Sequence, residues 1–261
     1  MSSLTTTGRR RDRTFGNRTL IALDCRIESI VHEFKASAVW RTLIDPCTPA
    51  EHVLSILREV YWEVHCYHPW TTYAGFAMLG RINPDELRVM RTLLLHKWDE
   101  VEHRVWALDG YKAFGGDPQR IGREAEFMSP GAFAVAAVWE RLAIQIDPLA
   151  YLGAEYLFED LTARLAKDAV AALRSRTLSA EGMRFIVDHA EEDIKHSALL
   201  KRLISEVSAR KPELHAQVLY AFDCFQHVYP MPLWNGSYER AMRGATEAIW
   251  PTGAVGTSGS N

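Results

Sequence analysis

The sequence predicts an all-α protein built as one bundle of helices. Apolar residues recur with the helical period along most of the chain, and the alternating stretches typical of strands are absent. Proline follows a capping residue in Asn83-Pro84 and Ser129-Pro130, as expected at helix N-termini. With 48% hydrophobic and 24% charged residues, the 261-residue chain has ordinary globular composition and can bury a large core.

Other proline and glycine residues mark where further helices begin and end. Thr48-Pro49 and Asp147-Pro148 mark two more starts, and Gly115-Gly116 ends the long helix before Ser129. The predicted helices span residues 18–44, 49–67, 69–80, 84–113, 131–146, 148–175, 179–208, 212–228 and 235–248.

The predicted domain organisation is one helical domain with a tail at each end. Residues 1–17 are rich in Thr and Arg and lack an apolar run, so we expect a flexible basic tail. No repeat and no long linker divides residues 18–250. Residues 251–261 are rich in Gly and Ser, which predicts a second flexible tail.

Charge and cysteine usage narrow the class of protein. The formal net charge of -3 gives no general attraction to nucleic acid or to an anionic membrane. No segment reaches the roughly 20 apolar residues of a membrane span, and the N-terminus lacks a signal-peptide core. The four cysteines are scattered and form no CxxC pair, which favours reduced thiols in a cytoplasmic protein.

The predicted helix 179–208 carries ionisable groups on its apolar face. His189, Asp193 and His196 lie at positions i, i+4 and i+7, so their side chains form one stripe. Phe185 continues this stripe on one side and Leu200 on the other. Burying a carboxylate costs several kcal/mol unless it is paired or binds a metal, so this pattern points to a buried polar site.

The predicted helix 148–175 repeats this pattern. Glu159 interrupts an apolar stripe that includes Tyr156 and Val170. Glu155 lies one turn earlier, and we expect it to pair with an arginine such as Arg141.

The predicted helix 84–113 presents two uncharged faces. His96, Glu100 and His103 are aligned on one face, and charged residues flank it. The opposite face is apolar and comprises Leu94, Trp98, Val101, Val105 and Leu108. This pattern predicts a helix packed between two layers, with His96, Glu100 and His103 pointing inward.

A mixture of imidazoles and carboxylates predicts the kind of ligand. Such donors suit iron or manganese, whereas a closed zinc site more often recruits cysteine. Two metals need about six protein ligands with positions left open for oxygen and substrate. The six inward candidates are Glu100, His103, Glu159, His189, Asp193 and His196. A lone buried histidine is usually a satisfied core residue, and we expect this of His68.

These residues resemble a known family. His189-x-x-x-Asp193-x-x-His196 on a late helix, with Glu159 and His103 upstream, looks like the haem-oxygenase-like di-metal oxidases. These share their fold with thiaminase and pyrroloquinoline-quinone synthase relatives. The stretch YLGAEYLFE that ends at Glu159 resembles the segment of the family's middle glutamate, and the YHPW stretch at His68 resembles its early helix. The resemblance runs from about residue 50 to about residue 205.

The resemblance implies a function. Members bind two irons, reduce O2 and then hydroxylate amines, cleave carbon–carbon bonds or fragment amino and fatty acids. It therefore implies a di-iron oxidase acting on a small amine, amino-acid-derived or acyl substrate in a biosynthetic pathway, with an external electron donor and a homodimeric assembly. By resemblance, Glu159, His189, Asp193, His196 and His103 are metal ligands, with iron expected and manganese as the alternative.

One departure leaves a choice open. The family often has a glutamate seven residues before the first-helix histidine, and here His96 occupies that place. Glu100 lies three residues before His103, so we favour Glu100 with His103 as the core pair. His96 is then a ligand to the second metal or a supporting hydrogen-bond donor.

Three other interpretations compete. A ferritin-like di-iron bundle uses two Glu-x-x-His steps on separate helices, but the candidate site has only the step from Glu100 to His103. The second alternative is a cofactor-free enzyme or a small-molecule binding protein of the same fold. The third is a plain helical scaffold for protein partners.

Overall fold

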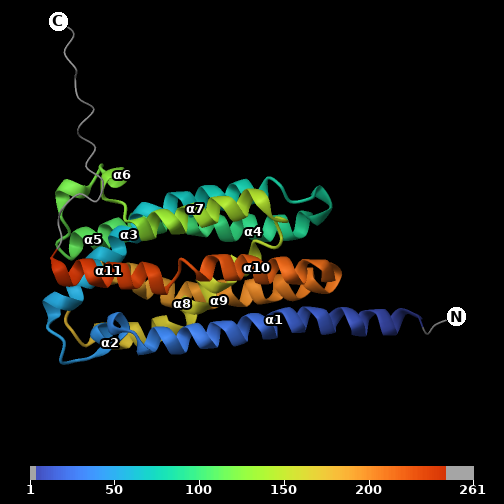
Figure 1. Cartoon of the computed structure of the whole chain (residues 1–261), viewed down its shortest axis with the longest axis horizontal. Coiled ribbons are helices and arrows are strands. Elements are labelled where there is room, and N and C mark those ends of the chain that lie inside the picture. The colour runs from blue at the N-terminus through green and yellow to red at the C-terminus, as the bar shows by residue number, and fades with distance from the viewer. Residues whose placement is uncertain (1–3, 245–261) are drawn as a thin grey trace, which may run out of the picture.

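Helices account for nearly all of residues 4–244, the part of the chain that the computed structural model describes, with side chains described from Arg18 onward (Figure 1). No strand occurs in this range, which confirms the all-α prediction. None of the described helices combines the length and the apolar character that crossing a bilayer requires. The α-helices are α1 (Leu4–Ala36), α2 (Ala38–Ile44), α3 (Ala50–Leu79), α4 (Leu87–Asp99), α5 (His103–Ala113), α6 (Glu124–Phe127), α7 (Pro130–Gln145), α8 (Leu152–Arg174), α9 (Ala180–Arg210), α10 (His215–Gln226) and α11 (Met231–Arg243). Short 3-10 helices lie at Pro84–Glu86, Glu100–Glu102, Pro118–Arg120 and Pro212–Leu214.

The long helices run side by side along the bundle (Figure 1). Helix α9 packs against α1, α5 and α8, and α8 also packs against α10. Helix α3 packs against α5, α7 and α11. The middle of the bundle is therefore enclosed by α3, α5, α8 and α9.

Capping side chains start several helices where the sequence predicts them. The Ser129 hydroxyl accepts a hydrogen bond from the Ala132 N–H at 3.0 Å, and the Asn83 side chain accepts one from the Asp85 N–H at 2.9 Å. Gly115 follows α5 with φ of 77°, a left-handed conformation that ends the helix as predicted. Asp147 instead stabilises a turn by accepting from the Leu149 N–H, so α8 begins only at Leu152.

The two ends of the described range differ from the predicted boundaries. Helix α1 begins at Leu4 instead of near residue 18, so it extends into the range predicted as a flexible basic tail. The flexibility of residues 1–17 stays a prediction. Ser37 interrupts the predicted helix 18–44, because its hydroxyl accepts from the Trp40 N–H and starts α2. Helix α11 ends before Gly244, and the predicted tail 251–261 lies outside the described residues.

Helix α3 is continuous where the sequence predicts two helices. Pro69 lies inside it, although an interior proline costs about 3 kcal/mol or more. Tyr67 before Pro69 and Ala74 and Met78 after it are buried in the same core. Packing on both sides of the proline offsets the lost backbone hydrogen bond.

The outer face of α4 and α5 is exposed, so the prediction that this helix packs between two layers is wrong within one chain. Trp98 is 68% exposed and Val105 is 53% exposed, and Leu94 and Val101 are exposed beside them. The four residues are four, three and four positions apart in the sequence, and they lie on α4, in the 3-10 segment Glu100–Glu102 and on α5. Exposed apolar side chains gathered on one short segment are typical of an interaction surface.

We propose that a second copy of the chain covers this exposed face, so that the protein is a homodimer. A symmetric pair brings the same face of each subunit together. Light scattering at micromolar concentration should give about twice the chain mass of 29.6 kDa. Trp98→Glu should give a monomer, because the contact would bury an unpaired carboxylate. Tyr220→Glu, at a 59% exposed aromatic residue on α10, should remain dimeric. A single-chain mass for the unmodified protein contradicts this proposal.

Candidate metal centre

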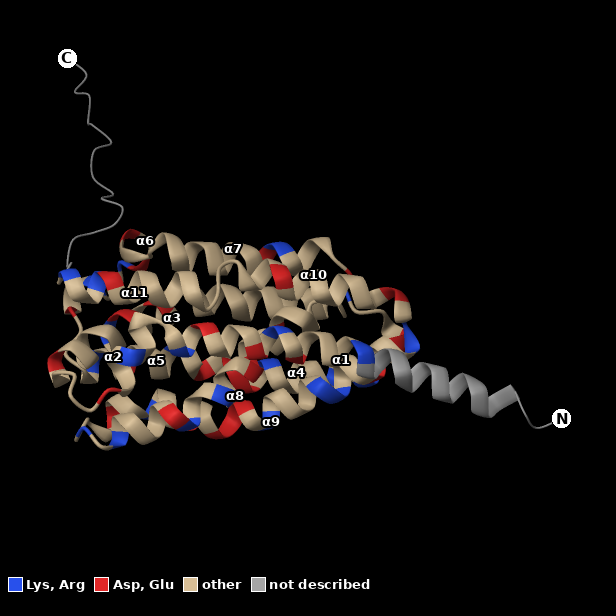
Figure 2. Ribbon diagram, turned by 60° about the horizontal axis from the view of Figure 1, so that its bottom comes forward, with Lys and Arg blue, Asp and Glu red and all other residues tan. Residues whose placement is uncertain are grey.

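Ionisable side chains meet in the middle of the bundle, between α3, α5, α8 and α9. Figure 2 shows Asp and Glu positions gathered at mid-length around α8. His96 lies near the end of α4, Glu100 begins the 3-10 segment, and His103 begins α5. All three side chains are buried, which confirms the prediction that this face points inward.

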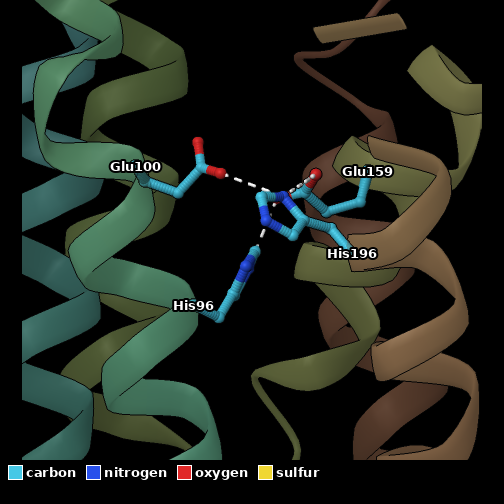
Figure 3. Close-up of side chains that lie close together, drawn as sticks. All are labelled: His96, Glu100, Glu159 and His196. Carbon is cyan, nitrogen blue, oxygen red and sulfur yellow. Dashed lines mark ion pairs between the residues drawn. The ribbon is translucent and has the colours of Figure 1, made fainter. Parts of the chain in front are cut away.

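Four of these side chains form one close group. The group comprises His96, Glu100, Glu159 and His196, each of which offers a ligand atom within 4.8 Å of the others. His196 Nδ1 lies 3.1 Å from Glu100 Oε1 and 3.5 Å from Glu159 Oε2. His96 Nε2 lies 3.4 Å from Glu159 Oε1. The side chains point toward one another from three segments of the chain (Figure 3).

A second group shares Glu100. It contains His68, Glu100 and His103, whose ligand atoms also lie within 4.8 Å of one another. His103 Nδ1 lies 2.7 Å from Glu100 Oε2, so the two oxygens of Glu100 face different groups. The other ring nitrogen of His103 lies 3.3 Å from Glu192 Oε2.

His189 and Asp193 lie beside these two groups. The His189 ring is centred 4.2 Å from the His103 ring, and its Nδ1 donates a 2.7 Å hydrogen bond to the Phe185 carbonyl. This bond fixes the proton on Nδ1 and leaves Nε2 as the lone-pair donor. Asp193 is buried beside Glu159, whose charge helps to raise its pKa. All seven predicted ligands therefore lie in or beside one cluster, and their role as ligands stays a prediction.

Several buried atoms of the cluster make no hydrogen bond within the described residues. They are Nδ1 of His96, both ring nitrogens of His103, Nδ1 of His196 and Oε1 of Glu100. Some have short distances to a neighbour, but the groups are not aligned for hydrogen bonding. An unmade hydrogen bond of a buried group costs about 1–3 kcal/mol. Imidazole and carboxylate donors left in this way fit metal ions of the iron and manganese class.

A buried ion pair supports the cluster on the side of His96. Lys97 Nζ lies 2.6 Å from Glu155 Oε2, and His96 Nε2 lies 3.4 Å from the same oxygen. Gly75 on α3 leaves room for this lysine, because a Cβ there would lie 2.7 Å from Lys97 Cδ. Glu155 thus pairs with Lys97, and the prediction of Arg141 as its partner is wrong. A carboxylate in this position orients the histidine beside it.

Burial and neighbouring charges shift the pKa values of the cluster in different directions. Burial alone would raise the pKa of Glu100, but its contacts with His103 and His196 outweigh burial and hold that pKa well below its usual range. Burial opposes protonation of His196, yet Glu100 and Glu159 raise its pKa to about 10. Burial, followed by the charges of Glu159 and Glu100, raises the pKa of Asp193 well above its usual value. Without metal, protons balance part of the negative charge.

The pKa values of the two histidines on the other side of Glu100, His68 and His189, are lowered. Burial lowers the pKa of His68 to about 4 and, with the charge of His103, the pKa of His189 to about 3. Both rings are therefore neutral at physiological pH, which is the form that binds a metal.

Sequence reasoning missed His68 and Lys97. The sequence predicts His68 as a satisfied core residue, but it joins Glu100 and His103. Its only signal is its place in the YHPW stretch, which resembles the family's early helix. Lys97 has the pattern of a charged flank of its helix, and no local pattern indicates that Gly75 makes room for it.

Comparison with known proteins gives a family and a fold. Residues 69–229 match the model of a family described as iron-containing redox enzymes, which is more than half of the chain. A domain of unknown function with a heme oxygenase-like fold from Shewanella denitrificans OS217 superposes with a TM-score of 0.68 and 17% identity, over 87% of this chain and 96% of that one. A TenA homolog from Pseudomonas syringae pv. tomato str. DC3000 superposes with a TM-score of 0.58 and 16% identity, over 79% and 93%. These similarities confirm the haem-oxygenase-like fold. No curated protein gives a significant sequence match.

The pKa shifts predict how pH affects the metal-free protein. His196, with its raised pKa, stabilises the fold fully below about pH 6.5 and loses this contribution as pH rises toward 10. His68 and His189, with pKa values lowered by burial, have no effect on stability above about pH 6.5 and destabilise the fold as pH falls, because the unfolded state then binds more protons. We expect the melting temperature without metal to be highest near about pH 6.5.

Added Fe(II) or Mn(II) should raise the melting temperature most on the alkaline side, because a metal ion replaces the proton on His196. Differential scanning fluorimetry at about pH 5, 6.5 and 9 measures this dependence. His196→Gln should reduce the fall of the melting temperature on the alkaline side. An unchanged melting temperature between about pH 6.5 and 9 in metal-free protein would contradict the shift assigned to His196.

Proposed function

Because the chain belongs to the family of iron-containing redox enzymes, we propose that it is a non-haem di-iron oxidase or oxygenase. Its substrate would be a small amine, amino-acid-derived or acyl compound in a biosynthetic pathway. The observation that carries this proposal is the place of Glu100, which belongs to two buried groups of potential ligands at once. One carboxylate shared in this way suits a pair of neighbouring metal ions.

The donor set divides into two halves around Glu100. His68, His103 and His189 would hold one ion, and His96, Glu159, Asp193 and His196 would hold the other. Iron held by these residues would supply the electrons that reduce O2 and the oxidising power for the substrate, and an external donor would restore the electrons. The donor set also suits manganese.

The protein's own groups orient the ligands. Glu155 holds His96 in place and is itself neutralised by Lys97. The Phe185 carbonyl fixes the tautomer of His189. A cofactor-free enzyme or binding protein of this fold would leave the buried ring nitrogens of His103 without hydrogen-bond partners, which argues against that alternative.

The first test of this proposal is metal content. After anaerobic loading and removal of free metal, we expect about two irons per chain, because the two halves each offer three or more donors. Inductively coupled plasma mass spectrometry of the folded protein measures the ratio. A folded protein without stoichiometric metal would refute the di-iron proposal.

The second test separates Glu100 from His96. Glu100→Ala should weaken both metal sites, since Glu100 belongs to both groups, whereas His96→Ala should weaken only one. Anaerobic titration with Fe(II) measures the number and affinity of the sites. His227→Ala, at an exposed histidine on the surface, should retain both sites. If His96→Ala loses both metals and Glu100→Ala keeps both, the assignment is reversed.

A further inference from the structure

An apolar cavity of about 130 Å³ ends at the candidate metal centre. Its walls come from α1, α2, α3, α8, α9 and α11, and include Phe34, Trp40, Val60, Ala169, Phe185 and Trp234. His68, Glu100 and His189 form its polar end. No lysine, arginine or aspartate is found among the described residues that line it.

Three other polar side chains of the wall, Tyr61, Thr162 and Tyr229, make hydrogen bonds within the protein. The Tyr61 hydroxyl donates to the Gly182 carbonyl at 2.8 Å, and the Thr162 hydroxyl donates to the Phe158 carbonyl at 3.1 Å. Tyr229 is hydrogen-bonded to Thr162. A charged group placed along this wall would therefore lose its water without gaining a counter-charge, which is strongly unfavourable.

The cavity reaches only one half of the candidate centre. His68, Glu100 and His189 line it, whereas His96, Glu159 and His196 do not. The half containing His96 is backed by the Lys97–Glu155 pair. A molecule in the cavity therefore meets the half formed by His68, Glu100, His103 and His189.

From these observations we infer the chemical class of the substrate, on the basis of the di-iron function proposed above. The substrate has one metal-coordinating head group, which faces His68 and His189, and an uncharged apolar body. A dry apolar cavity of about 150 Å³ holds a benzene molecule, so this one accepts a body of about six carbon atoms. The class comprises short apolar acids and amines and excludes nucleotides, phosphate esters and compounds with a charge on the body.

Cobalt(II)-loaded protein allows the inference to be tested by binding, because coordination of a head group changes the visible absorption of cobalt. Hexanoate should perturb these bands, and 6-aminohexanoate, which differs by a terminal ammonium, should bind at least tenfold more weakly. From butanoate upward, affinity should rise about fourfold per methylene and level off near about six carbons. Hexylamine in the same assay distinguishes an amine head from an acid head.

Two alanines of α8 provide a matched pair of variants. Ala169 lines the cavity and Ala171 is exposed on the same helix. Ala169→Leu should shift the plateau to shorter acids, whereas Ala171→Leu should leave it unchanged. Equal binding of hexanoate and 6-aminohexanoate, or equal plateaus for the two variants, would overturn the inference.

The failure of the di-iron proposal gives a different result. If cobalt(II) does not bind, that proposal is refuted, and the cavity is tested alone with the uncharged probe 1-hexanol. Fluorescence of Trp40 and Trp234 in metal-free protein should then report binding of 1-hexanol but not of 6-amino-1-hexanol. Equal binding of these two alcohols would overturn the inference about the body of the substrate.

Discussion

The carboxylate of Glu100 constrains the arrangement of the surrounding helices, because a buried carboxylate is stable only when opposite charges or donors surround it. Its two oxygens face His196 and His103, which lie on α9 and at the start of α5. Helix α9 must therefore approach α5 closely, and α8 must bring Glu159 to the same point. The packing of α5, α8 and α9 therefore depends on the same contacts that bring the residues of the site together.

The surroundings of Glu100 differ on its two sides. Toward His96, the Lys97–Glu155 ion pair places a fixed acceptor beside the histidine, so that half of the centre is closed and held in place. Toward His68, the structure supplies an apolar cavity. Electrostatic interactions strengthen where water is excluded, so the dry side is the side on which a substrate would be held close to the ions.

The sequence predicts most of the helices and the inward faces, because both depend on local periodicity and on capping. Ser129 and Asn83 start helices through bonds to residues a few positions away, which sequence spacing alone reveals. The continuity of α3 through Pro69 depends instead on packing against distant helices, which offsets a local penalty. The exposure of Trp98 likewise depends on which elements are present to cover it, and a single helix pattern cannot supply that information.

The sequence favours Glu100 over His96 as the partner of His103, but the relative positions of the two side chains depend on a feature that periodicity does not reveal. An α-helix advances about 100° per residue and a 3-10 helix about 120°, so the segment Glu100–Glu102 rotates α5 by about 60° more than a regular helix would. Periodicity gives the alignment of His96, Glu100 and His103 only for a regular helix. With the tightened segment in place, Glu100 contacts both His103 and His196 while His96 lies against Glu155 and Glu159. The extra rotation introduced by this short segment therefore determines whether His96, Glu100 or both reach the cluster. In the structure, both residues belong to it.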